Sequence, residues 1–358
     1  MPMISERLGI LWPGVPLALA SALLFGASTP VAKQLLGTID PWMLAGLLYF
    51  GAGFGLAAVY ALRRVLELPA SEAPLRRSDA PWLFGIVVSG GLAGPVLLML
   101  GLAHTDAASA SLLLNLEGVA TMAIAWLAFR ENVDRRLLVG ALVIFAGALA
   151  LSWQGGGATL SPGALLLAGA CLAWGIDNNL TRKVSAADPL QITMLKGLVA
   201  GSVNLALASI QGAALPAFGT SITAGAVGFL GYGLSLMLFV LALRHLGAAR
   251  TSAYFSSAPF IGAVLAVVFL GDALSWQLVL AGALMGLGLW LHLSERHVHE
   301  HAHTLLAHEH RHVHDEHHLH EHAPNDPAGE PHSHPHRHLP LVHRHPHYPD
   351  LHHHHAHH

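Results

Sequence analysis

Three ionisable residues, Glu117, Asp177 and Lys196, stand inside long apolar stretches of the chain. Such a side chain at the centre of a membrane helix costs about 2.5 to 3.5 kcal/mol on insertion scales. Ionisable residues in this setting are therefore candidates for binding a substrate, an ion or a proton.

The positions of Asp177 and Lys196 allow them to form an ion pair. At about 1.5 Å of rise per helical residue, they lie roughly 8 and 11 Å from the same end of their helices. Such a pair lowers the cost of burying either charge, and it is a purely structural alternative to a role in transport. The sequence offers Glu117 no partner at its own depth. An unpaired buried carboxylate tends to bind a proton, which is the property that a proton-coupled carrier needs.

Asn178 and Asn179 directly follow Asp177, and three consecutive polar residues cannot all face lipid. At least one of them is expected to face a cavity, where it would contact substrate. Amides also bridge helices, at about 0.6 kcal/mol on average, and this alternative stays open. Asn115, two residues before Glu117, points about 200° away from it around a helix and is not expected to share its ligand.

A second set of chemistry-bearing residues follows the apolar core, because 25 of the 28 histidines come after Leu293. Neighbouring imidazoles suit nickel, cobalt, zinc and copper, and alternate residues of an extended chain lie on one side. The expected metal ligands are His297, His299, His301, His303, His308, His310, His312, His314, His317, His318, His320 and His322. No fixed geometry is encoded, so the tail does not specify one metal. A pH-responsive tail that titrates near pH 6.5 is the alternative, and no cofactor is required by the core.

The composition indicates a membrane scaffold for these residues. Hydrophobic residues make up 53% and charged residues 11% of the 358, and the mean hydropathy is +0.52, which disfavours a water-soluble domain. Cys171 is the single cysteine, so a disulfide framework is excluded. Lys and Arg form no stripe with interleaved aromatics, so nucleic-acid binding is not expected. The core has no His-Glu-x-x-His, Gly-x-Ser-x-Gly or Walker motif, so neither an enzyme nor an ATP-driven pump is indicated.

Ten segments approach the roughly 20 apolar residues that cross a bilayer. They lie at 14–36, 41–62, 80–103, 107–128, 136–153, 161–182, 189–211, 220–244, 249–270 and 275–293. Cytoplasmic loops retain Lys and Arg, and the basic loops here lie on the side of the N-terminus, with Lys33 as the exception. We therefore expect a multi-pass protein of the inner (plasma) membrane with both termini, and the histidine tail, in the cytoplasm.

The two halves of the core share an internal repeat. Residues 18–33 align with 167–182, which matches Phe25-Gly26 with Trp174-Gly175, and residues 102–131 align with 243–272. Each half then reaches an Asp-Pro pair that would open the next helix.

Each copy has five spans, an odd number, so the two copies must have opposite orientations in the bilayer. The predicted fold is thus an all-α polytopic membrane protein, with two inverted five-helix repeats at 14–153 and 161–293. A histidine-rich tail at 294–358 follows, and its composition predicts disorder.

A five-helix inverted repeat with Phe/Trp-Gly in its first helix, a small-residue fourth helix and a Glu/Asp turn before its fifth resembles the EamA family of the drug/metabolite transporter superfamily. The resemblance covers about residues 14 to 293. It implies ten helices, a central cavity between the halves, alternating access, and export or uptake of small metabolites such as amino acids without ATP. The chain departs from the family at Gly118, where the fourth helix usually has a proline, whereas the second repeat keeps Pro259.

The leading hypothesis is an inner-membrane secondary transporter that exports a small metabolite, with Glu117, Asp177, Asn178, Asn179 and Lys196 as cavity residues. One alternative is an exporter of divalent nickel, cobalt or zinc whose tail raises the ion concentration at the inner mouth. Another is a membrane-anchored metal store or sensor without flux. The expected partners are membrane lipid and a small-molecule or metal substrate, and a homodimer is left open.

Overall fold

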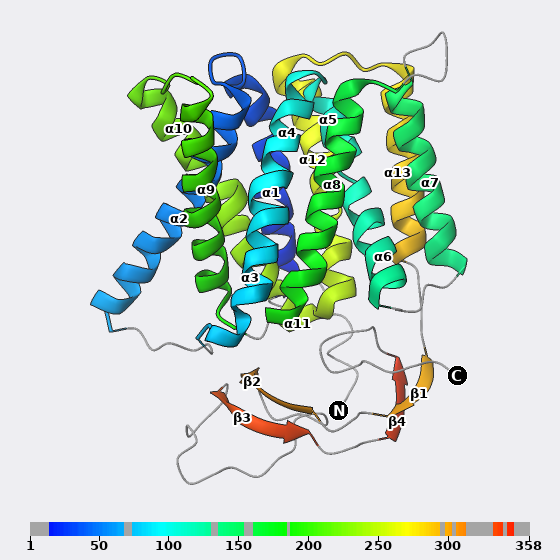
Figure 1. The fold of residues 1–358 in the computed structure, drawn as a ribbon. Helices are drawn as coiled ribbons and strands as arrows, with labels where there is room; N and C mark the ends of the chain where they lie inside the picture. The colour runs from blue at the N-terminus through cyan, green and yellow to red at the C-terminus, as the bar shows by residue number, and fades with distance from the viewer. Residues whose placement is uncertain are drawn as a thin grey trace.

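The computed structural model describes residues 14–67, 74–129, 135–153, 160–184 and 187–293, together with four strands between 298 and 346 (Figure 1). The first half of the core contains α1 (Gly14–Leu35), α2 (Pro41–Val65), η2 (Arg77–Asp79), α3 (Ala80–Ile86), the π-helix η3 (Val87–Ala93), α4 (Gly94–Ala103), α5 (Ala107–Leu113), α6 (Leu116–Phe129) and α7 (Arg135–Ser152). The second half contains α8 (Pro162–Thr181), η4 (Arg182–Val184), α9 (Pro189–Ile210), α10 (Phe218–Gly228), the π-helix η5 (Phe229–Leu234), α11 (Ser235–Phe255), α12 (Ala258–Leu265), the π-helix η6 (Ala266–Leu270) and α13 (Trp276–Leu293). Every predicted apolar segment falls on helix, but the loop expected at 245–248 lies inside α11, which continues to Phe255.

The two Asp-Pro pairs begin helices as the sequence predicted. The carboxylate of Asp40 accepts a hydrogen bond from the Trp42 amide at 2.9 Å, and that of Asp188 accepts one from the Leu190 amide at 2.9 Å. An aspartate at this position satisfies an amide that has no partner within the helix, and a proline in the first turn has no N–H to leave unsatisfied. The helices α2 and α9 therefore start in the same way in both repeats.

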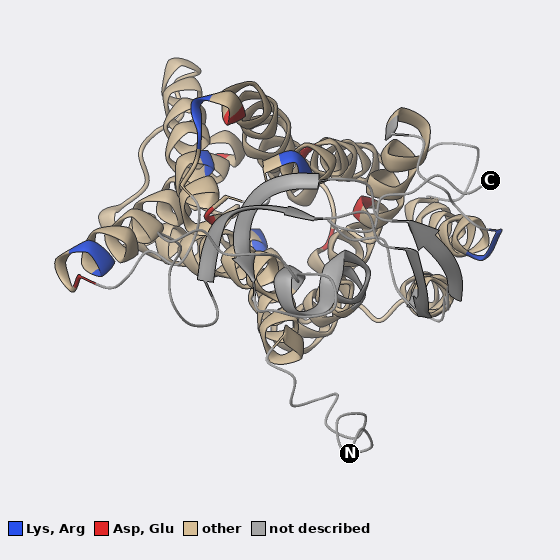
Figure 2. Ribbon diagram, turned by 90° about the horizontal axis from the view of Figure 1, so that it is seen from below, with Lys and Arg blue, Asp and Glu red and all other residues tan. Residues whose placement is uncertain are grey.

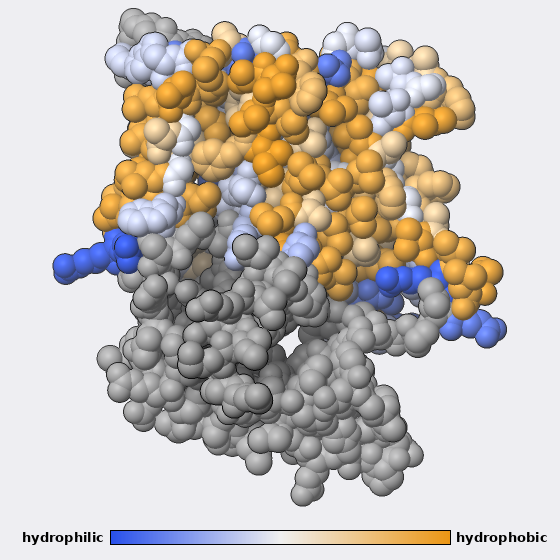
Figure 3. Space-filling model, turned by 180° about the vertical axis from the view of Figure 1, so that it is seen from behind, coloured by the Kyte–Doolittle hydropathy of each residue, from blue (hydrophilic) through white to orange (hydrophobic). Residues whose placement is uncertain are grey.

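The outside of the helical core is apolar. Figure 3 shows a hydrophobic surface over most of the height of the core, with hydrophilic residues at its two ends, and large side chains such as Phe54 and Leu127 are exposed. Seven helical segments in the described residues are long and apolar enough to cross a membrane, and shorter apolar helices lie at 258–270 and 276–292. The helix α8 belongs to neither group because its end carries Asp177, Asn178 and Asn179. The chain is thus a multi-pass membrane protein, and ten spans remain a prediction.

Packing between the helices follows the internal repeat. The helix α8 packs against α4 and α6, and the repeat-equivalent helix α1 packs against α11 and α12. We call these two groups the α8 bundle and the α1 bundle. The helices α2 and α9 are equivalent in the two repeats and lie side by side, and the same holds for α7 and α13 (Figure 1). Each bundle therefore combines one helix of one repeat with two of the other.

Two of the π-helices also occupy equivalent positions. The alignment of the repeats places η3 opposite η5, and Gly90 opposite Gly231. A π-turn contains one more residue than an α-turn and often marks a functional position. The sequence did not predict these turns.

The basic residues visible from below in Figure 2 lie on several helices at one end of the core. Lys33, the exception noted in the sequence, ends α1 and donates hydrogen bonds to the carbonyl oxygens of Leu102 at 2.6 Å and Thr105 at 2.8 Å. A cation at the last carbonyls of a helix is favourable. The Lys33 ammonium therefore binds carbonyl oxygens at the C-terminal end of α4.

The described part of the tail consists of four short segments. The strands β1 (Val298–Ala302) and β4 (Val342–Pro346) form one antiparallel pair, and β2 (Leu306–His312) and β3 (His332–His338) form another. Alternating residues have the two-residue period of a strand, which suits this pairing. Of the predicted ligands, His299, His301, His308, His310 and His312 fall in these strands. The predicted ligands His297, His303, His314, His317, His318, His320 and His322 lie outside the described residues.

Candidate polar site in the α8 bundle

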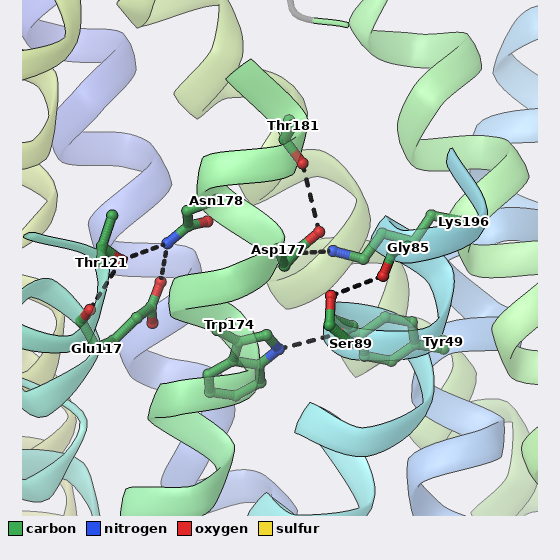
Figure 4. Close-up of polar contacts among 11 residues, drawn as sticks. Tyr49, Gly85, Ser89, Glu117, Thr121, Trp174, Asp177, Asn178, Thr181 and Lys196 are labelled. Carbon is green, nitrogen blue, oxygen red and sulfur yellow. Dashed lines mark hydrogen bonds and ion pairs between the residues drawn. The ribbon is translucent and has the colours of Figure 1, made fainter. Parts of the chain in front are cut away.

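The predicted site residues come together along the C-terminal half of α8. Asp177, Asn178 and Asn179 lie near its end, Glu117 lies in the first turn of α6, and Lys196 lies in the second turn of α9. Figure 4 shows Glu117 on one side of α8 and Lys196 on the other. The structure thus divides the site into an ion pair and a carboxylate–amide contact.

The ion pair predicted from depth is confirmed. Lys196 Nζ lies 2.5 Å from Asp177 Oδ2, and both side chains are only 7% exposed. The Thr181 hydroxyl donates a longer hydrogen bond, 3.3 Å, to the other oxygen of Asp177. Because neither charge can be solvated at this depth, each compensates the other.

The π-helix η3 packs directly on the Asp177 carboxylate at Gly90. A Cβ atom on Gly90 would clash with that carboxylate. The Gly90 carbonyl oxygen accepts hydrogen bonds from the Tyr49 hydroxyl at 2.8 Å and from Trp174 Nε1 at 3.2 Å. Glycine is therefore required here for the close approach of backbone to side chain.

Replacing Gly90 with alanine is expected to displace the Asp177 carboxylate from Lys196. Overpacking costs about 1 to 3 kcal/mol, so the melting temperature of the purified protein in detergent should fall and flux should be lost. Gly118→Ala is the matched control, because a Cβ at Gly118 meets no atom within 4 Å. Equal melting temperatures for the two variants would contradict this account of Gly90.

Glu117 is held by an amide. Asn178 Nδ2 donates to Glu117 Oε1 at 2.9 Å and lies 3.2 Å from Thr121 Oγ1, and the Thr121 hydroxyl donates to the Glu117 carbonyl oxygen at 2.8 Å (Figure 4). The expectation that Glu117 has no partner was wrong. Asn178 follows Asp177 by one residue, which is about 100° around a helix, so it points toward α6 while Asp177 points toward η3 and α9. The run of three polar residues was the signal for this contact.

A break in the predicted span at 107–128 places Glu117. Helix α5 ends at Leu113 and α6 begins at Leu116, so Glu117 lies in the first turn of α6. The partial positive charge at a helix N-terminus favours a carboxylate there. Among the described residues Glu117 forms no ion pair. The groups that stabilise a negative charge on Glu117 are the Asn178 amide and the N-terminal end of α6.

The other two amides are structural. Asn179 is 3% exposed, and its Nδ2 bridges the carbonyl oxygens of Thr121 at 3.0 Å and Gly175 at 2.8 Å, while its Oδ1 has no hydrogen-bond partner. Asn115 lies in the break between α5 and α6, where its amide donates to the Leu112 carbonyl oxygen at 2.9 Å and lies 3.7 Å from Met285 Sδ of α13. The alternative of a helix-bridging amide therefore fits Asn179.

The two parts of the site differ in accessibility. Asp177 and Lys196 are buried, whereas Glu117 and Asn178 are half-buried and the neighbouring Gly118 is exposed. Glu117 and Asn178 therefore lie nearer the surface of the core than the ion pair.

Aromatic rings connect the site to the α1 bundle. The repeat-equivalent residues Phe25 and Trp174 meet edge to face with ring centroids 6.2 Å apart, and Phe25 also contacts Tyr232 at 5.7 Å. Tyr232 in turn contacts Tyr49 at 5.5 Å, and its buried hydroxyl has no hydrogen-bond partner. We call Phe25, Tyr49, Trp174 and Tyr232 the aromatic cluster. Phe25 and Trp174, which occupy the same position in the two repeats, thus contact each other between the two bundles.

The two bundles differ in charge at equivalent positions. The alignment of the repeats places Ser28 of the first span opposite Asp177, Leu48 of the second span opposite Lys196, and Ala258 of the ninth span opposite Glu117. In the α1 bundle Gly231 packs against Ser28 where Gly90 packs against Asp177. The scaffold is therefore nearly symmetric, while the ionisable groups of the site belong to the α8 bundle.

In the residues that the structure describes, no group of three or more His, Cys, Asp or Glu side chains is placed to hold a metal ion. An apolar pocket of about 160 Å³ lies elsewhere, between α1 and the α12–η6 segment, and is lined by residues such as Pro30 and Phe269.

Comparison with known proteins agrees with a transport scaffold. The EamA-like transporter family matches residues 12–153 and again 161–294. An "Uncharacterized transporter" of Methanothermobacter thermautotrophicus is 27% identical over 296 residues, which cover 78% of this chain and 86% of that protein. A "Probable terminal-alkyne amino-acid exporter" of Streptantibioticus cattleyicolor is 25% identical over 68% of this chain and 84% of that protein. A solved structure with a TM-score of 0.58 and 22% identity, covering 78% of this chain and 94% of that one, shares the fold.

Proposed function

Because the chain belongs to the EamA-like transporter family, we propose that it is a secondary transporter of a small molecule, coupled to protons at Glu117. The observation that carries this proposal is the contact between Glu117 and Asn178: a half-buried carboxylate that is stabilised by an amide and forms no ion pair within the described residues. Such a group can gain and lose a proton, as a coupling residue must.

The proposed transport cycle is alternating access between the α8 bundle and the α1 bundle, across ten spans of the inner membrane. The equivalent packing of α8 and α1 supports it, as do helices broken near the site, which transporters of inverted-repeat design often use for binding. Both termini are placed in the cytoplasm because of the basic loops. The direction we propose is export, in line with the exporter among the relatives.

The proposal is tested by reconstitution. Full-length protein is placed in liposomes loaded with a mixture of amino acids, amines and small organic acids, a pH gradient is imposed, and the compounds released are measured by mass spectrometry. We expect release of at least one compound that liposomes without protein retain. Retention of all compounds under an intact gradient would contradict the proposal.

A second candidate function follows from the histidine tail: export, storage or sensing of nickel, cobalt, zinc or copper. We propose that the tail binds such a metal on the cytoplasmic side, because many imidazoles alternate with Glu and Asp there. Metal substrate and small-molecule substrate are separated by the effect of the tail on flux.

Deletion of residues 294–358 is expected to remove most metal binding and to leave small-molecule flux unchanged, because the polar site lies in the core. Elemental analysis of cells that lack the gene and re-express either form, challenged with each metal in turn, provides the measurement. Cellular content of one metal that falls with the full-length protein and falls less with the truncated form would instead support metal export. Unchanged metal binding by the purified truncated protein would contradict the role of the tail.

A further inference from the structure

We propose that Lys33 is a gate residue that holds one end of the core closed, and that this end opens when α4 moves away from it. We call it the outer end, where α1 and α4 end and α5 begins, at the top of Figure 1. The inference rests on the proposed alternating access between the α1 bundle and the α8 bundle. It assigns a role to the lysine that is the exception in the distribution of basic residues.

Lys33 joins the two bundles through its charge. It lies in the last turn of α1, and its ammonium donates to the carbonyl oxygens of Leu102 at 2.6 Å, Thr105 at 2.8 Å and Ala103 at 3.5 Å. An ammonium has three N–H donors, so each donor has an acceptor at the end of α4. Carbonyl groups in the last turn of a helix have no partner in the helical pattern. The contact therefore satisfies groups of the α8 bundle with a side chain of the α1 bundle.

On its other side, the end of α4 is fixed to the start of α8 by close packing. A Cβ on Gly163 of α8 would clash with the Thr105 hydroxyl and would lie 3.1 Å from the Gly101 carbonyl oxygen. A Cβ on Gly101 would in turn lie 2.8 Å from the Leu167 side chain. Close-packed contacts of this kind have discrete arrangements and do not deform continuously. We therefore expect the end of α4 to move together with α8.

Helix α5, in contrast, is fixed to the α1 bundle. The carboxylate of Asp272, which follows η6, accepts a hydrogen bond from the Ala108 amide at 2.8 Å. A Cβ on Gly262 of α12 would lie 3.1 Å from the Cβ of Ser111. Both contacts lie between α5 and the segment that contains α12 and η6. We therefore expect α5 to stay with α1 and α12 when the bundles separate.

The chain has a break at each end of α5. A turn at 104–106 separates α5 from α4, and a second break at 114–115 separates it from α6. Both neighbours belong to the α8 bundle. Hinges are formed by a few residues in loops or at the ends of helices. The two breaks are thus the places where the chain can bend if α4 and α6 move and α5 does not.

The Lys33 contact can be released at low cost. Lys33 and Thr105 are half-buried and Ala103 is exposed, so water can replace the carbonyl oxygens around the ammonium. Helices α1 and α4 pack on each other much less than each packs within its own bundle. The other lysine in a span, Lys196, is only 7% exposed and cannot be solvated in this way. One lysine therefore stabilises the fold, whereas the other holds two moving parts together.

Two pairs of spin labels on the full-length protein in lipid nanodiscs measure the distance between α1 and α8 at each end of the core. The outer pair is Gln34→Cys, at an exposed position of α1, with Leu165→Cys, which is 55% exposed in the first turn of α8. The inner pair is Leu19→Cys with Ile176→Cys, which are 43% and 40% exposed. The native Cys171 is fully buried and stays in place. Double electron–electron resonance gives the distribution of each distance.

Lys33→Met is expected to open the outer end. The ratio of longer to shorter outer distances should rise about tenfold, which is the order of effect of losing a hydrogen bond to a charged group. The inner distance should become shorter at the same time, because alternating access closes one end as the other opens. Lys33→Arg keeps the charge and the donors and should change neither distance. Asp106→Asn should also change neither, because the Asp106 carboxylate accepts from the Ser109 amide of its own helix.

Unchanged outer distances in the Lys33→Met protein would overturn the inference, as would an equal change in the Lys33→Arg or Asp106→Asn protein. Lengthening of both pairs would also overturn it, because that result means general loosening of the fold. If the Lys33→Met protein does not insert, Lys33→Gln removes the same charge and gives the same comparison.

The liposome experiment keeps the proposed function separate from the gate. Release of a compound from liposomes together with unchanged distances would leave the transporter standing and reject Lys33 as the gate residue. Distances that change in opposite directions, without release of any compound, would support the gate and reject the proposed transport.

Discussion

Glu117→Gln is expected to abolish the response of transport to a pH gradient while the protein remains folded in the membrane. Glutamine has the same shape as glutamate and keeps an oxygen that can accept the hydrogen bond from Asn178, so the contact between α6 and α8 is retained. It cannot ionise, so the proton can no longer be exchanged. Flux driven by the pH gradient should fall to the level of liposomes without protein.

The matched control is Glu67→Gln, which makes the same chemical change on an exposed residue. Both variants should insert and elute from size-exclusion chromatography like the unmodified protein. A Glu117→Gln protein whose flux keeps its pH dependence would remove Glu117 from the coupling mechanism.

Lys196→Met is expected to destabilise the protein by about 3 to 5 kcal/mol, because it leaves the Asp177 carboxylate buried without its counter-charge. Methionine has a long unbranched side chain like the stem of lysine, so little of the effect arises from an empty volume. Adding Asp177→Asn should restore most of the loss, because both charges are then gone.

A double-mutant cycle on the free energy of unfolding measures this coupling. The variants are Lys196→Met, Asp177→Asn and the two together, compared by denaturant unfolding in detergent. A coupling energy of more than about 1 kcal/mol is expected for groups in direct contact. Additive effects would mean that the ion pair contributes nothing beyond its separate side chains.

The sequence predicted the features that depend on one helix or on two helices that follow one another in the chain. The capped starts of α2 and α9 follow from Asp-Pro, and the pairing of Asp177 in α8 with Lys196 in α9 follows from their depth. These features need no knowledge of which distant helices are neighbours.

The features that were missed depend on contacts between distant segments. The break between α5 and α6 contains neither proline nor glycine, whereas the equivalent start of α12 has Pro259. Near the break, Cys171 Sγ lies 3.7 Å from the Leu113 carbonyl oxygen and 4.0 Å from the Leu114 carbonyl oxygen. Cys171 belongs to α8, so these carbonyl oxygens gain this contact because α8 packs on the segment between α5 and α6.

The π-helix η3 was also missed because its hydrogen-bond partners come from distant segments. Its buried carbonyl groups at Gly90 and Gly91 accept hydrogen bonds from Tyr49, Trp174 and Asn204, which belong to α2, α8 and α9. A local pattern of glycines and apolar residues does not reveal these partners. The contact of Glu117 with Asn178 likewise required knowing that α6 packs on α8.

The two carboxylates and one ammonium of the polar site have an electrical consequence. With Glu117 ionised, the three groups together carry a net charge of minus one, and with a proton on Glu117 they carry none. A membrane potential acts only on charge that moves through it, at about 2.3 kcal/mol per elementary charge for each 100 mV. In the proposed transport cycle, a site with protonated Glu117 would therefore reorient without regard to voltage, whereas a site with ionised Glu117 would not. A negative interior would oppose movement of the ionised site toward the cytoplasmic face.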